Sequence, residues 1–131
     1  MRNRLCAFVL LLTFCQLGGA ASPEIRITGI YSDLHYIKES GDLIGMELLV
    51  LPGGGNPFHC PAFFQLAEGQ GPTAVLVDLE AVADHFEFRV PANGGSPEMH
   101  FSVRFTAHEA VVKNTVGGLE EHLRRGRSYW E

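Results

Sequence analysis

The stretch PFHCPAFFQL, residues 57–66, places a histidine directly before a cysteine. An imidazole beside a thiolate is the pairing that activates a cysteine nucleophile, and both groups bind zinc. If residues 58–66 form one strand, however, adjacent side chains point to opposite faces of the sheet. Cys60 then turns inward as a small core residue, and His59 turns outward. The two side chains can serve one site only if Pro61 introduces a bulge, and an outward Cys60 would be a free thiol available for an intermolecular disulfide.

The other candidate residues form no recognisable motif. Six histidines are scattered singly, without the short His-x-His or Cys-x-x-Cys pairs of metal sites. The chain has no Gly-x-Ser-x-Gly elbow, and Gly53–Gly55 is not followed by the lysine and helix of a phosphate loop. We therefore expect no catalytic residues, no metal and no cofactor. The sequence leaves enzymatic activity uncertain and favours its absence.

The first 21 residues have the layout of a secretory signal peptide. Arg2 and Arg4 precede an apolar run over Leu5–Leu17, and small residues follow it up to Ala21. That run is shorter than the roughly 20 residues with which a helix spans a membrane, so we expect no integral membrane span in the mature chain. We predict that residues 22–131 form a single exported domain, periplasmic or secreted.

The mature chain is acidic and holds one cysteine. Of the 10 Lys and Arg residues the signal removes Arg2 and Arg4, whereas all 15 Asp and Glu residues lie beyond it, so the net charge is 8 − 15 = −7. Phosphate backbones require basic surfaces, and we expect no nucleic-acid partner. Cys6 and Cys15 leave with the signal. Cys60 then has no partner for an internal disulfide, so packing must stabilise the fold.

Alternation of apolar and polar side chains indicates strands. It is clearest over Met99–Phe105 and recurs in earlier segments, including residues 25–31. Residues 43–51 are apolar at nearly every position, which favours a strand covered on both faces. Residues 107–124 are ambiguous and favour strand over helix. The prediction is an all-β, antiparallel up-and-down meander of seven or eight strands, closed or nearly closed into a small barrel, with a two-sheet β-sandwich as the alternative.

The two ends of this predicted barrel carry a further pattern. Gly29-Ile30-Tyr31 opens the first strand, and Arg124, Arg125 and Arg127 lie near the end of the last. The arrangement resembles the calycin group of small secreted β-barrels, to which lipocalins and avidins belong. In that group a Gly-x-Trp element begins the first strand, and an arginine of the last strand packs across the tryptophan. The resemblance implies that one of these arginines packs across Tyr31, which stands in place of the tryptophan.

Two kinds of function fit such a domain. The first is non-covalent binding of a small apolar ligand in or at the barrel, by the bulky residues that parity turns inward: Tyr31, Met46, Leu48, Phe86, Phe88, Phe101, Val103 and Phe105. The second is a structural or protein-interaction role in the cell envelope, with an envelope protein as partner. It would use the exterior and a basic, aromatic C-terminal surface: Arg124, Arg125, Arg127, Tyr129 and Trp130. For the last two aromatics the pattern favours a plainer role, in a final strand whose aromatics cap one mouth of the barrel.

Overall fold

The structure, a computed structural model, describes residues 25–53, 55–69 and 71–131. The predicted signal peptide, residues 1–21, lies outside the described residues. Within them the chain forms nine strands: β1 (Gly29–Ser32), β2 (His35–Ile37), β3 (Asp42–Val50), β4 (His59–Glu68), β5 (Val75–Val82), β6 (His85–Val90), β7 (Met99–Phe105), β8 (Glu109–Asn114) and β9 (Glu120–Arg125).

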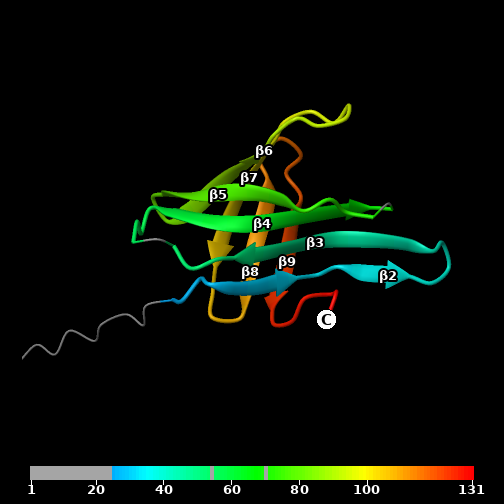
Figure 1. Ribbon diagram of the computed structural model, residues 1–131, viewed down its shortest axis with the longest axis horizontal. Helices are drawn as coiled ribbons and strands as arrows, with labels where there is room; N and C mark the ends of the chain where they lie inside the picture. Colours follow the sequence, from blue (N-terminus) through cyan, green and yellow to red (C-terminus); the bar gives the residue numbers. More distant parts are fainter. Residues whose placement is uncertain (1–24, 54, 70) are drawn as a thin grey trace, which may run out of the picture.

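Eight of these strands close into a ring in which each is antiparallel to the next. The order around the ring is β1-β3-β4-β5-β6-β7-β8-β9, and β9 pairs with β1 to complete it. β2 pairs with β3 and stands outside the ring. Figure 1 shows β3, β4 and β5 running side by side, with β7, β8 and β9 crossing behind them. The predicted up-and-down meander closed into a small barrel is confirmed, and the sandwich alternative is wrong.

The extra strand, β2, has no alternation that would predict it. β1 and β2 pair with β3 in the same register, and residues 33–34 between them interrupt the strand. There the Asp33 carboxylate, rather than a backbone carbonyl, accepts the N–H of Met46. Gly45 lies against this interruption at φ +108°, and a Cβ on it would stand 2.7 Å from the Asp33 carbonyl oxygen. Only glycine fits there.

The ring closes through a short seam between β1 and β9. These strands share two residue pairs, Tyr31 with Arg125 and Ser32 with Arg124, because the chain then continues along β3 as β2. A two-pair ladder supplies few backbone hydrogen bonds. The seam therefore depends on side-chain contacts as well.

Side chains of one parity fill the barrel. Phe64 lies with its ring centroid 5.1 Å from that of Phe88 and 5.0 Å from that of Phe101, and the last two rings stack at 16°. Each such pair contributes about 0.5 to 1.5 kcal/mol beyond the burial of its area. The middle of the barrel is therefore packed. The other core side chains that are at most 1% exposed are Tyr31, Leu48, Val50, Ala62, Leu79, Val103, Ala110, Val112 and Leu123.

The strand predictions have different outcomes. The strand favoured over residues 107–124 is confirmed, since β8 and β9 occupy most of that segment. The strand expected over residues 25–31 is wrong in its first half, because β1 begins at Gly29 and the preceding residues lie at the end of the barrel. The sequence predicts that β3 is covered on both faces. This holds at Glu47, whose side chain points out of the barrel but is only 5% exposed.

Candidate functional site

A cavity of about 800 Å³ opens at one end of the barrel, which we call the open mouth. Four parts of the chain surround it: residues 25–28, the loop between β3 and β4, the β5–β6 hairpin and the end of β7. They meet because neighbouring strands of an antiparallel barrel run in opposite directions, so one strand ends and the next begins at the same rim. The open mouth is therefore assembled from segments far apart in sequence.

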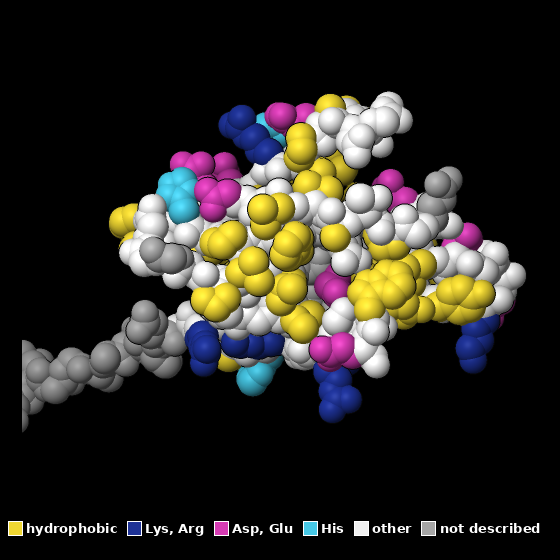
Figure 2. Space-filling view, viewed as in Figure 1, with side chains coloured by type: hydrophobic (Ala, Val, Ile, Leu, Met, Phe, Trp, Pro, Cys, Tyr) yellow, Lys and Arg dark blue, Asp and Glu magenta, His cyan; other side chains and the backbone are white. Residues whose placement is uncertain are grey.

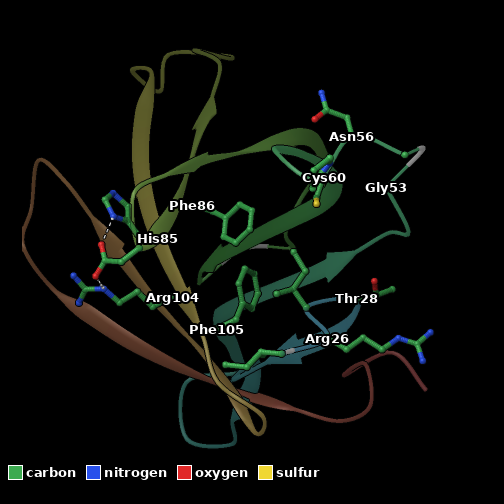
Figure 3. Close-up of a pocket in the computed structure, with 14 residues that line it drawn as sticks. Arg26, Thr28, Gly53, Asn56, Cys60, His85, Phe86, Arg104 and Phe105 are labelled. Carbon is green, nitrogen blue, oxygen red and sulfur yellow. Dashed lines mark hydrogen bonds and ion pairs between the residues drawn. The ribbon is translucent and has the colours of Figure 1, made fainter. Parts of the chain in front are cut away.

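Aromatic side chains form the floor of the open mouth. Phe86 and Phe105 line the cavity with their ring centroids 5.7 Å apart, and Phe105 packs on the buried Tyr31 ring at 5.1 Å. Figure 3 shows the two phenylalanine rings in the middle of the cavity. Ile25 and Ile27 add apolar surface beside them. The floor is thus the end of the barrel core, where apolar side chains reach solvent.

Charged side chains at the rim pair with one another. The Nδ1 of His85 lies 3.1 Å from Asp84 Oδ1 and its Nε2 lies 3.1 Å from Glu87 Oε1, while Arg104 Nε lies 3.6 Å from Asp84 Oδ2. The hydrogen bonds to Asp84 and then Glu87 raise the pKa of His85. The His85 hydrogen bond and then the Arg104 charge lower the pKa of Asp84. In Figure 3 this group lies to one side of the aromatic floor, and Arg26 points away from it.

The adjacent His59 and Cys60 point to opposite faces, as the parity predicts. Cys60 is 8% exposed, and its sulfur faces the open mouth near Gly53. His59 lies on the outer wall, with Nδ1 2.7 Å from Asp78 Oδ2. β4 continues through Pro61 in unbroken register with β5, so the proline does not bring the two together. Burial, and then the charge of Asp78, raise the pKa of the Cys60 thiol, which reduces its thiolate fraction and its reactivity.

The eight residues predicted to line a pocket turn inward but spread along the whole barrel. Phe86 and Phe105 lie at the open mouth. Met46 and Phe101 line a second cavity, of about 420 Å³, at the opposite end. The remaining four are buried between the two ends: Tyr31, Leu48, Phe88 and Val103. The structure therefore divides the predicted set into two cavity linings and a packed middle.

The C-terminal arginines also separate. The guanidinium carbon of Arg125 lies 5.7 Å from the centroid of the Tyr31 ring, and its Nη2 donates to the Thr28 carbonyl at 2.7 Å. Arg125 thus packs across Tyr31, which is the contact that the resemblance to calycins implies. Arg124 and Arg127 are exposed. Of the five residues of the predicted C-terminal surface, Arg125 therefore lies apart, in the seam between β1 and β9.

The last residues fold back onto the outer wall. The Glu47 carboxylate accepts the Ser128 hydroxyl at 2.7 Å and the backbone N–H of Tyr129 at 2.9 Å. The indole N–H of Trp130 donates to Gln65 Oε1 at 3.0 Å. Tyr129 and Trp130 therefore lie against β3 and β4, and the expectation that they cap a mouth of the barrel is wrong.

Sequence reasoning missed most of the lining outside the strands. Alternation at Ile25 and Ile27 predicts an ordinary strand, and no residue type signals that the chain joins the sheet only at Gly29. Asn56 and Asp84 stand in turns, whose distance from the cavity depends on strand register. The usable signal was the inward parity of two large aromatics near the ends of β6 and β7.

Two further observations concern the described residues alone. No three of their His, Cys, Asp or Glu side chains are placed to hold a metal ion. No helix among them has the length and apolar character needed to cross a membrane.

Comparisons of the chain with protein-family models, curated proteins and solved structures found no significant match. A proposal about function therefore has to rest on the geometry of the chain.

Proposed function

We propose that the protein is an exported β-barrel, periplasmic or secreted, that binds a small apolar molecule at the open mouth. The observation that carries this proposal is the cavity of about 800 Å³ whose floor is formed by Phe86 and Phe105. Sites for small molecules commonly measure about 300 to 1,000 Å³. Because the middle of the barrel is packed, the ligand binds at the end of the barrel and not deep within it.

The lining favours a ligand with little charge. The side chains near the floor are apolar, and Thr28 and Asn56 offer neutral polar groups. Asp84, His85 and Arg104 already satisfy one another. A ligand that buries about 300 Å² of apolar surface gains about 7 kcal/mol before the costs of association, so we expect binding no tighter than micromolar.

The contact between Arg125 and Tyr31 supports a relationship with the calycin barrels. It joins the first and last strands of the ring, as in that group, and the ring has eight antiparallel strands. Small-molecule binding at one end of the barrel is the kind of activity that this relationship suggests.

Titration with the apolar fluorescent probe N-phenyl-1-naphthylamine tests the proposed function. We expect saturable enhancement of probe fluorescence by the mature protein. A Cβ on Gly53 would make ordinary contacts, 3.8 Å from the Cys60 sulfur, so Gly53→Phe places a ring in the open mouth. This variant should bind the probe at least about tenfold more weakly, which corresponds to about 1.4 kcal/mol.

The matched control is Gly117→Phe, the same substitution at the cavity of the opposite end. It should leave probe binding unchanged, and thermal unfolding should show that both variants are folded. The proposal fails if the wild-type protein shows no saturable binding, or if Gly117→Phe weakens binding while Gly53→Phe does not.

A further inference from the structure

One outer wall of the barrel is apolar. Ile30, Leu49, Phe63 and Leu76 are direct cross-strand neighbours on β1, β3, β4 and β5, and we call them the apolar row. Their side chains point out of the barrel, on the face opposite to the core side chains of the same strands. Phe63 and Leu76 are 40% and 62% exposed. Figure 2 shows hydrophobic side chains gathered over β3, β4 and β5. Ile30 and Leu49 are half-buried beside them, and contiguous apolar surface that includes exposed members marks interaction sites.

The C-terminal tail widens the apolar row. Tyr129 and Trp130 are held by Glu47 and Gln65, which lie two residues along β3 and β4 from members of the row. The two aromatic rings pack against each other at 5.1 Å yet remain 40% and 56% exposed. Tyrosine, tryptophan and phenylalanine are enriched at the centres of protein interfaces. Tail and row together therefore form one aromatic and aliphatic surface.

The wall on the opposite side of the barrel is not apolar. The outward positions of β6 to β9 carry mainly charged and polar side chains: Glu87, Arg89, His100, Ser102, Arg104, Lys113, Glu120 and His122. Val111 is the one apolar side chain among the outward positions of β8. The apolar row is a specific feature of the other side.

Charges of opposite sign flank the apolar row. At its β5 end, Asp78 and Glu80 are exposed and share the outward face with Leu76, and Asp78 also contacts His59 Nδ1 at 2.7 Å. At its β1 end, β9 and the start of the tail present Arg124 and Arg127, both exposed. Neither arginine forms an ion pair with another described residue. The wall is therefore acidic at one end, apolar in the middle and basic at the other.

We propose that this wall is the interface of a homodimer, in which the apolar rows of two copies pack face to face. The two-fold axis lies in the interface and runs roughly along the strands. Rotation about that axis lays the β1 end of one row against the β5 end of the other. Arg124 and Arg127 of each copy then lie on the same side of the interface as Asp78 and Glu80 of the other. An axis across the strands would oppose like charges, so charge selects the first arrangement.

A second copy suits this wall better than a lipid surface does. The full chain has a formal net charge of −5 and the predicted mature chain one of 8 − 15 = −7, which an anionic membrane repels. Charged ends of opposite sign on one surface are self-complementary, which is the property that a two-fold interface requires. The apolar row lies on the side of the barrel and leaves the open mouth accessible, so the dimer does not depend on the proposed ligand.

Sedimentation equilibrium of the mature protein tests the interface. We expect the mass of a dimer at about 100 µM, with a dissociation constant in the micromolar range of weak interfaces. Phe63→Glu and Leu76→Glu place a carboxylate in the apolar row and should each raise that constant at least about tenfold. Leu119→Glu changes a residue that is 75% exposed at the end opposite the open mouth and should leave the constant unchanged. Circular dichroism checks that every variant is folded.

Charge reversal tests the direction of the axis. A variant with Arg124→Glu and Arg127→Glu has two acidic ends, and a variant with Asp78→Lys and Glu80→Lys has two basic ends. Each alone should dissociate at least about tenfold more readily than the wild type. An equimolar mixture should form heterodimers about as tight as the wild-type dimer.

Two results overturn the proposal. The first is a single-chain mass for the wild type at about 100 µM, and the second is a dimer that the Phe63 and Leu76 variants leave intact. If the single-chain wild type also co-sediments with zwitterionic vesicles, and Phe63→Glu abolishes this, the wall is assigned to a lipid surface. If the charge variants fail to combine, the stated axis is wrong.

Discussion

Replacing Arg125 with methionine tests how far the closure of the barrel depends on one side chain. Arg125 contacts the Tyr31 ring and donates to the Thr28 carbonyl, across a seam of two residue pairs. Methionine keeps much of the apolar stem but removes the guanidinium. The change therefore isolates the cation–π contact and the charge-assisted hydrogen bond.

Both contributions have known scales. A hydrogen bond from a charged donor contributes about 1.5 to 3 kcal/mol, and a cation–π contact about 0.5 to 1 kcal/mol at a partly exposed site. Arg125→Met should therefore lower the free energy of unfolding by about 2 to 4 kcal/mol. With a urea dependence of about 1.5 kcal/mol per molar, the unfolding midpoint should fall by about 1 to 3 M.

Urea unfolding followed by circular dichroism measures this loss. Arg124→Met is the matched control, because Arg124 is the exposed neighbour on the same strand, and it should cost less than about 0.5 kcal/mol. Arg125→Met should also weaken probe binding, because the bond to Thr28 fixes one wall of the open mouth. A cost below about 1 kcal/mol, or an equal cost for the control, would refute the importance assigned to this contact.

Three further predictions have defined outcomes. Glu47→Ala removes the acceptor that holds the tail, so emission from Trp130, the only tryptophan, should shift to the red, whereas Glu47→Gln should shift it less. Leu123→Ala, at a fully buried site, should lower the free energy of unfolding by about 2 to 5 kcal/mol in urea titrations, and Leu119→Ala, at a site 75% exposed, by less than about 0.5 kcal/mol. Nuclear magnetic resonance titration should place the pKa of His85 above its ordinary value, so the stability from its acidic partners is full at lower pH and is lost as pH rises through the raised pKa.

The proposed functions occupy different parts of the molecule. The open mouth lies at one end of the ring, and the apolar row lies along β1, β3, β4 and β5. A ligand titration on a variant such as Leu76→Glu can therefore show whether a monomer still binds the probe. Retained binding would show that the two surfaces act independently.

Much of the barrel follows from local pattern alone. Alternation over Met99–Phe105 specifies which side chains are buried, because adjacent residues of a strand must face opposite sides. The same rule separates His59 from Cys60 before any tertiary contact is considered. Short turns between the strands then favour neighbours in space, which yields the meander. These inferences succeed because each depends on residues close together in the sequence.

The candidate site could not be read in the same way. Parity identifies Phe86 and Phe105 as inward, but it assigns the same direction to Phe88 and Val103, which are buried. Whether an inward side chain lines a cavity depends on its height in the barrel and on which loops reach it. Both depend on strand register and stagger, which long-range pairing decides.

The sequence by itself determined the class of fold, the two faces of each clear strand and the core position of Cys60. Only the tertiary structure decided that β2 leaves the ring, that Arg125 closes the seam and that the tail binds Glu47 on the outer wall. Those contacts join residues as far apart as Thr28 and Arg125. Periodicity reports the environment of a residue relative to its sequence neighbours, whereas such contacts depend on how the whole sheet curls and closes.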